Sequence, residues 1–243
     1  MGHGVQPVAT LAVIIATVIT SYRGFTDQRV LERYMFQVEG ILGYRQYYRI
    51  LSSGFMHANG PHLFFNMFCF YSFGQSIERY FGWPLLLGIY AASLIGGSLL
   101  ALAIHRNHGD YCAVGASGAV SGILFASIFL LPGGSVMLMF LPIPIPASVF
   151  AIGYTAVSIY GIKSQRGNIG HDAHLGGAIT GLLLIALLYP RAVLHSLGLF
   201  LLILALVLGF FGYYFRQQLR DLFDQWQARG QTAQKNKSTS QAP

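Results

Sequence analysis

Seven mostly apolar stretches, separated by more polar segments, are the feature that most constrains how this chain can fold. A helix needs about 20 mostly apolar residues to cross the hydrocarbon core of a bilayer. The stretches are Val8–Tyr22, Pro61–Tyr80, Trp83–Ile104, Val114–Leu131, Ala147–Ile162, His171–Tyr189 and Leu194–Phe215. Backbone groups inside lipid must be hydrogen-bonded within the segment. The sequence therefore predicts an all-α, polytopic membrane helix bundle with about seven transmembrane helices.

Composition supports a protein embedded in the lipid bilayer over most of its outer surface. Charged residues make up only 9% of the chain, whereas about 25% is usual for a soluble domain. The net charge is +7, but the basic residues are dispersed, and no basic run with interleaved aromatics indicates a nucleic-acid partner. Cys69 and Cys112 form neither a metal-binding spacing nor a disulfide framework.

The chain divides into three parts by this pattern. Residues 1–190 hold six predicted helices, residues 191–215 hold a seventh, C-terminal transmembrane helix, and a polar basic tail occupies 216–243. We expect the tail to be partly disordered, because it is polar and charged. Three alternating prolines in Pro142-Ile-Pro-Ile-Pro146 cannot form a regular helix interior, so residues 132–147 are interpreted as an apolar loop.

Ser117, in the sequence Gly115-Ala-Ser-Gly118, is the first candidate for chemistry. Its neighbours have almost no side chain, so another helix can approach closely and the hydroxyl stays reachable. A serine hydroxyl becomes a nucleophile when a base takes its proton. The alternative interpretation is structural: Gly118 and Gly122 form a small-residue repeat typical of helix packing in membranes.

His174 is the candidate base. It lies three residues before Gly177, and Gly181 follows four residues later, so all three share roughly one face of a helix. Close packing of this face against the Ser117 helix would bring the imidazole near the hydroxyl, and imidazole is the usual base near neutral pH. The alternative is an interfacial histidine at a helix end. Asp172 is two residues away and points elsewhere, so the prediction is a dyad.

Two further polar features lie on the helix predicted for Pro61–Tyr80. His62 and Asn66 are four residues apart on one face, and both can donate hydrogen bonds to the oxyanion of a tetrahedral intermediate. The alternative is a buried polar pair whose members hydrogen-bond to each other or to a backbone carbonyl oxygen. Glu78 lies near the other end of the helix; we interpret it as structural and expect it to pair with an arginine, with Arg49 as the candidate.

These motifs together resemble the rhomboid intramembrane serine proteases. The resemblance covers about residues 45–185, and order and spacing both match. The motifs are Tyr48-Arg49, His62-Leu-Phe-Phe-Asn66, Gly74-x-x-x-Glu78-x-x-x-Gly82, Gly115-Ala-Ser-Gly118, Pro142-Ile-Pro-Ile-Pro146 and Ala173-His-Leu-Gly-Gly177-x-x-x-Gly181. Each motif is weak alone, but several in register on successive membrane helices are specific.

The resemblance implies a six-helix catalytic core, a water-filled cavity and an intramembrane serine endopeptidase that needs no metal or cofactor. It implies Ser117 as nucleophile and His174 as base, with His62, Asn66 and the Ser117 amide as oxyanion donors next to Gly115. Its substrates would be single-span membrane proteins. Some members have an aromatic residue at the position of Ser121 that packs against the catalytic histidine; its absence here leaves the support of His174 unexplained.

Two other functions remain open from the sequence. One is a catalytically inactive rhomboid-like protein that binds membrane segments. The other is a histidine-dependent metal transporter or metalloprotease, suggested by His105-x-x-His108, His171-x-x-His174 and His57, although no His-Glu-x-x-His motif is present. A chelator distinguishes the latter, because it should not affect a serine dyad.

The expected location is multi-pass in a membrane, with the bacterial cytoplasmic membrane suggested by the small layout. The family implies an N-terminus inside, which leaves only Arg79 and Arg191 of the 15 basic residues on the inner side. The positive-inside rule favours the reverse orientation.

Overall fold

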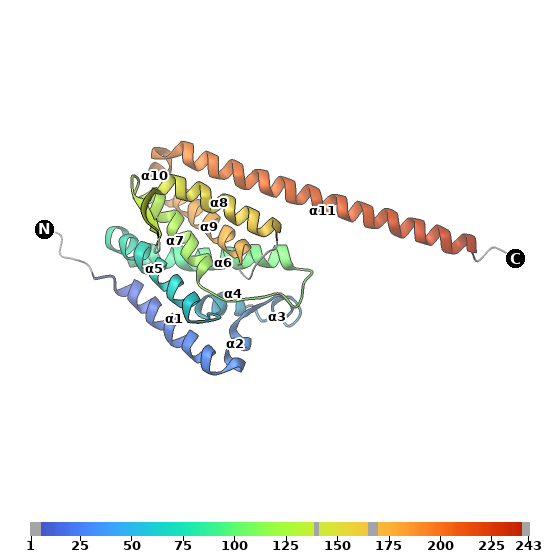
Figure 1. The fold of residues 1–243 in the computed structure, drawn as a ribbon, viewed down its shortest axis with the longest axis horizontal. Helices are drawn as coiled ribbons and strands as arrows, with labels where there is room; N and C mark the ends of the chain where they lie inside the picture. Colours follow the sequence, from blue (N-terminus) through green and yellow to red (C-terminus); the bar gives the residue numbers. More distant parts are fainter. Residues whose placement is uncertain (1–5, 139–140, 165–169, 240–243) are drawn as a thin grey trace. The chain divides into compact units, whose positions relative to one another are not determined.

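The computed structural model describes residues 6–138, 141–164 and 170–239. It consists of two units, Met1–Phe200 and Leu201–Pro243, each of which is considered by itself. Figure 1 shows the first unit as a bundle of packed helices. The long helices are α1 (Val8–Thr26), α5 (Gly60–Phe81), α6 (Trp83–His105), α7 (Ser117–Leu130), α8 (Ala147–Ser164), α9 (His171–Leu188) and α11 (Leu197–Thr239). The predicted all-α membrane bundle is confirmed.

The predicted spans differ in how well each suits lipid. Among the described residues, four stretches are long and apolar enough to cross a membrane, namely α1, α6, α9 and residues Leu197–Arg220 of α11. Helix α7 is shorter, with 14 residues, and every residue from Gly118 to Leu130 is buried. A central helix covered on all sides by other helices does not need to match the full thickness of the bilayer.

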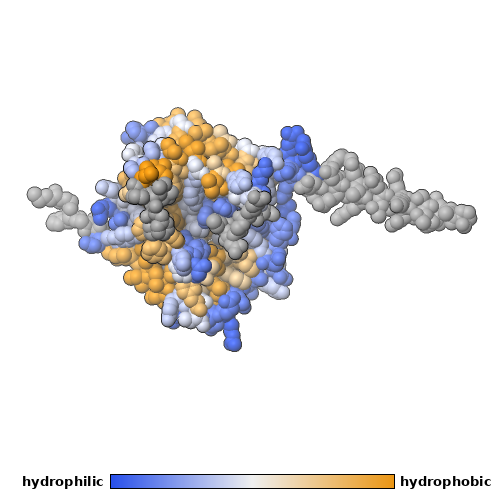
Figure 2. Space-filling model, viewed as in Figure 1, coloured by the Kyte–Doolittle hydropathy of each residue, from blue (hydrophilic) through white to orange (hydrophobic). Residues whose placement is uncertain are grey.

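Helix α1 shows how the bundle meets lipid. Its buried residues are small or polar, namely Thr10, Thr17, Ser21 and Gly24. Its exposed side chains are large and apolar, namely Val8, Leu11, Ile15, Val18 and Ile19. This arrangement is the reverse of a helix on a soluble domain, and Figure 2 shows hydrophobic patches on the surface of the molecule.

Glycines set the spacing between α7 and α9 at the centre of the bundle. A Cβ added to Gly177 would meet the backbone of Gly118, and one added to Gly181 would meet the backbone of Gly122. Small residues allow such close backbone approach between membrane helices. Residues Ser117 and His174 lie just before these contacts in their helices, so the packing draws both helix starts together.

The segment between α1 and α5 is folded rather than irregular. It contains α2 (Gln28–Tyr34), β1 (Phe36–Gln37), α3 (Val38–Leu42), α4 (Arg49–Ser52) and the 3-10 helix η1 (Ser53–Phe55). The buried Arg49 side chain holds it together by donating to the carbonyl oxygens of Glu32 and Met35 at 2.7 and 2.8 Å. Strand β1 pairs antiparallel with β2 (Cys112–Ala113), which ties this segment to the chain just before Ser117.

The expected pairing of Glu78 with Arg49 is wrong. Glu78 instead accepts hydrogen bonds from the backbone N–H groups of Ala9 and Thr10, at 2.7 and 2.8 Å, and from the Thr10 hydroxyl. The carboxylate therefore caps the N-terminus of α1, where free N–H groups and the helix dipole favour a negative charge. Arg49 precedes the start of α5 whereas Glu78 lies near its end, and a 22-residue helix is about 33 Å long.

The interpretation of residues 132–147 as a loop also needs correction. Strands β3 (Ser135–Leu138) and β4 (Leu141–Pro146) form an antiparallel hairpin, in which Val136 pairs with Ile145. Proline lacks an N–H group, so it is tolerated in a strand only where no ladder bond is needed. Alternation satisfies this condition, because the prolines share one side of the strand and Ile145 keeps its donor. A short helix, α10 (Pro190–His195), precedes α11. Helix α11 includes most of the polar tail, and the expected disorder of that tail stays a prediction.

Candidate active site

Ser117 is the first residue of α7. The loop before it is held by backbone contacts, since the N–H group of Gly115 donates to the carbonyl oxygen of Ser53 at 3.0 Å. Gly115 has a φ of +129°, a conformation that favours glycine. A Cβ there would lie 2.8 Å from Cε1 of His62. Glycine thus lets the His62 ring come directly against the loop that carries the nucleophile.

A single cavity of about 640 Å³ contains most of the predicted site. Ser117, His174, His62 and Gly115 all line it, from α7, α9, α5 and the loop before α7. Its polar lining also includes Ser53, Asn59, Ser98 and Tyr111. At ~30 Å³ for each water molecule, this volume has room for on the order of 20 waters. Water can therefore reach a serine hydroxyl inside a membrane bundle.

Asn66 occupies a different place. Its side-chain amide donates to the carbonyl oxygen of His62 at 3.0 Å, and it is buried rather than among the residues that line the cavity. An asparagine amide carries two hydrogens, so one remains for another acceptor. The structure therefore brings His62 into the cavity and leaves Asn66 behind it.

His174 lies in the first turns of α9 and its ring packs against two aromatic neighbours. The Tyr154 ring of α8 is stacked on it, with centroids 6.2 Å apart and planes 24° apart. The ring of His171 meets it edge-on at 6.0 Å. In the part of the chain that the structure describes, Ser117 and His174 share the cavity without a direct hydrogen bond, and such bonds often tighten only when substrate is bound.

Tyr154 is a residue that sequence reasoning missed. It lies on the predicted helix Ala147–Ile162 in a stretch without a motif, so nothing in the spacing relates it to His174. Its hydroxyl is hydrogen-bonded to the hydroxyl of Ser121, the residue at which the family resemblance leads us to look for an aromatic ring. The contact between α8 and α9 is visible only in three dimensions.

His57 is a second missed residue, and its side chain is fully buried. Its Nε2 accepts the backbone N–H of Ala116, next to the nucleophile, at 3.3 Å, and its Nδ1 lies 2.9 Å from the Ser21 hydroxyl. Because Nε2 accepts, Nδ1 carries the proton and donates to Ser21. Burial, reinforced by the neighbouring His62, lowers the pKa of His57 to about 3, so the ring is neutral at pH 7.

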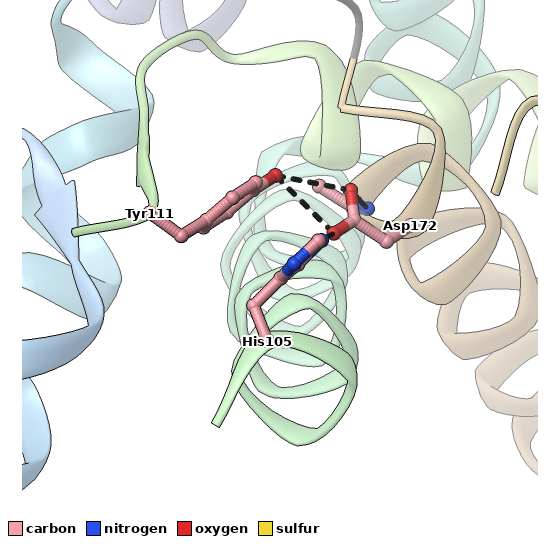
Figure 3. Close-up of polar contacts among 4 residues, drawn as sticks. His105, Tyr111 and Asp172 are labelled. Atoms are coloured by element: carbon pink, nitrogen blue, oxygen red, sulfur yellow. Dashed lines mark hydrogen bonds and ion pairs between the residues drawn. The ribbon is translucent and has the colours of Figure 1, made fainter. Parts of the chain in front are cut away.

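Asp172 is fully engaged away from His174, as the two-residue spacing predicts. Its carboxylate accepts from Tyr111 at 3.2 Å and lies 2.9 Å from Nε2 of His105. Figure 3 shows this cluster, in which the rings of His105 and Tyr111 lie parallel. The cluster fastens the end of α6 and the loop before β2 to the start of α9, beside the cavity. Of the carboxylates that the structure describes, none is therefore hydrogen-bonded to His174.

In the described part of the chain, no group of three or more His, Cys, Asp or Glu side chains is arranged so that it could hold a metal ion. His105 instead contacts the Asp172 carboxylate, and the ring of His171 meets the ring of His174.

Comparison with known proteins gives a consistent result. The rhomboid domain family matches residues 44–191. RHOMBOID-like protein 12, mitochondrial, of Arabidopsis thaliana is 33% identical over 183 residues, which cover 69% of this chain and 54% of that protein. Rhomboid protein 1, mitochondrial, of Saccharomyces cerevisiae is 33% identical over 55% of this chain and 40% of its own length. Rhomboid protease GluP of Bacillus subtilis is 28% identical over 78% and 36%. The chain thus spans about half the length of these relatives, or less.

Proposed function

Because the chain belongs to the rhomboid family, we propose that it is an intramembrane serine endopeptidase with Ser117 as nucleophile and His174 as general base. The observation that carries the proposal is the cavity, in which a serine at a helix N-terminus and a histidine from the neighbouring helix line one space that is large enough to hold water. Few other roles require a hydroxyl, an imidazole and water together inside an apolar bundle.

The reaction would proceed in two stages. His174 takes the proton of the Ser117 hydroxyl as Oγ attacks the scissile carbonyl carbon, and it then gives that proton to the leaving amine. Water from the cavity hydrolyses the acyl-enzyme by the same route. The negative oxygen of each tetrahedral intermediate would lie between the His62 ring and the Ser117 N–H group at the start of α7, where the helix dipole favours negative charge. Asn66 could add its second amide hydrogen after a side-chain rotation.

The substrate class follows from the setting. A site inside a membrane bundle meets single-span membrane proteins, at a place where their helix is unwound enough to expose a peptide bond. The lining of the cavity includes Gly115, Gly118 and Gly170, and the first two flank the nucleophile in sequence, which favours small residues beside the scissile bond. We also propose the bacterial cytoplasmic membrane as its location, although the relatives include mitochondrial proteins as well as one from Bacillus.

The experiment that tests this function uses the purified protein in liposomes with a generic single-span substrate. We expect cleavage by the parent and none by Ser117→Ala or His174→Ala, with all three proteins folded. A chelator should leave cleavage unchanged. A fluorophosphonate probe should label the parent at Ser117, since only an activated serine reacts. A folded parent that neither cleaves nor reacts with the probe would instead support the inactive, segment-binding protein.

A further inference from the structure

The proposed dyad does not by itself explain which group holds the His174 imidazole in its orientation. Asp172 is engaged by His105 and Tyr111, and the rings of His171 and His174 form a T-shaped pair with planes 72° apart. The Tyr154 ring is stacked on the His174 ring, with the two planes only 24° apart. Among the described side chains, Tyr154 is therefore the group best placed to fix the plane of the imidazole.

Tyr154 is itself held at both ends. Its ring packs edge-on against Phe125 of α7, with centroids 5.7 Å apart, and lies 5.9 Å from Phe150 of its own helix. Its hydroxyl bonds to the hydroxyl of Ser121, one turn after the nucleophile. Position and tilt of the ring are thus determined by α7, the same helix that carries Ser117.

The direction of these hydrogen bonds follows from the donor inventory. The Ser121 hydroxyl lies 2.6 Å from the backbone carbonyl oxygen of Ser117, which can only accept, so Ser121 donates its one proton there. Tyr154 must then be the donor to Ser121. The hydrogen bonds thus run from the Tyr154 hydroxyl to Ser121, and from Ser121 to the backbone carbonyl oxygen of Ser117. Helix α7 therefore carries the nucleophile and also anchors the ring that packs against the base.

We infer that Tyr154, anchored by Ser121, is a positioning residue that orients the His174 imidazole toward Ser117. The inference rests on the proposed function, because it assigns the pair to the base of that dyad. Tyr154 supplies the aromatic surface from α8, with a serine on α7 as its anchor. A loss of this surface would let the imidazole rotate away from the hydroxyl while the cavity stays open to substrate.

The kinetic test compares Tyr154→Leu, Tyr154→Phe, Ser121→Ala and the double variant Ser121→Ala/Tyr154→Phe. We expect Tyr154→Leu to lower kcat by about 10- to 100-fold with KM close to that of the parent, the scale of a misplaced catalytic group. Tyr154→Phe keeps the ring and should lose only a few-fold. Ser121→Ala loses the same hydrogen bond and, in addition, its own bond to the Ser117 carbonyl oxygen. The double variant should be no worse than Ser121→Ala, because the hydrogen bond between the two hydroxyls is already absent there.

Tyr160→Leu is the matched control, since this tyrosine lies on the same helix and is 65% exposed. It should behave like the parent in kcat and thermal stability. A Tyr154→Leu protein with the activity of Tyr160→Leu would overturn the inference, and so would a Tyr154→Phe protein as impaired as Tyr154→Leu. Ser117→Ala is measured alongside, so that a failure of the proposed function is recognised separately by equal cleavage with and without the hydroxyl.

A spectroscopic measurement keeps the inference testable without activity. In protein labelled at its 8 histidines, the ring resonances of His174 are assigned by their absence in His174→Gln. Stacking should place them upfield in the parent and in Tyr154→Phe, and they should move downfield and broaden in Tyr154→Leu. Unchanged resonances in Tyr154→Leu would show that the tyrosine does not orient the ring.

Discussion

His57 is a residue whose role comes from its complete burial. Both ring nitrogens are used, one by the N–H of Ala116 and one by the hydroxyl of Ser21, which in turn donates to the carbonyl oxygen of Phe55. The ring therefore joins α1 to the loop that carries the nucleophile. It can do so only while Nε2 is unprotonated. In a protonated ring Nε2 would carry a hydrogen and could no longer accept the hydrogen bond from the Ala116 N–H group.

This requirement predicts a pH-dependent stability. The folded pKa of His57 is about 3 and lies below the ordinary value of 6.5, so the unfolded state binds the extra proton first as pH falls. The stability is fully present above pH 6.5 and is lost as pH falls from there toward 3. We expect the free energy of unfolding to fall by up to about 1.4 kcal/mol per pH unit from this group.

The measurement is denaturant unfolding in detergent between pH 7.5 and 5, for the parent, His57→Gln and His108→Gln. The exposed His108 should change nothing. His57→Gln should be less stable at pH 7.5 but should lose less on acidification. Equal pH slopes for the parent and His57→Gln would refute the assignment.

At the scale of the element, the contact between α7 and α9 decides whether the dyad can form. A methyl group at Gly177 would collide with the Gly118 backbone, which cannot move aside as a side chain can. We expect Gly177→Ala to lower stability by about 1–3 kcal/mol, the usual range for overpacking, and to lower kcat because the helix starts separate. Gly153→Ala, where a Cβ meets open space, should leave both quantities near the parent values in unfolding and cleavage assays.

Glu78 acts between α1 and α5. Both of its carboxylate oxygens accept hydrogen bonds from the start of α1, and a glutamine has only one oxygen to offer. Glu78→Gln should lower the unfolding free energy by about 1–3 kcal/mol, the range for an unsatisfied buried group, with kcat nearly unchanged. The exposed Glu39→Gln is the control. A Glu78→Gln protein of normal stability without activity would make Glu78 functional instead.

At the scale of the whole molecule, orientation is the open question, because the family and the charge distribution disagree. If α1, α5 and α6 cross in turn, the loop with the exposed Cys112 lies opposite the N-terminus, on the side to which the cavity opens. With the N-terminus inside, a membrane-impermeant maleimide should label Cys112 in intact cells. Cys112→Ser should abolish labelling, which leaves the half-buried Cys69 as background. Labelling only after permeabilisation would establish the reverse orientation.

Much of the architecture was predictable because it depends on local pattern. Apolar length locates the membrane helices, and the family motifs at His62, Ser117 and His174 identify the rhomboid fold, which the comparisons confirm. Each motif lies within one helix or turn, where spacing alone determines which residues share a face. The hairpin at residues 135–146 was missed because prolines that exclude a helix are also compatible with one side of a strand.

The sequence by itself thus determined the class of fold, the family and the candidate dyad of Ser117 and His174. Only the tertiary structure decided that Glu78 caps α1 rather than pairing with Arg49, that His57 holds the Ala116 N–H and that Tyr154 covers His174. The physical reason is the same in each case. These contacts join parts of the chain that are far apart in sequence. Which side chains meet depends on how closely the helices approach and how each is rotated about its axis, and neither can be read from spacing within one helix.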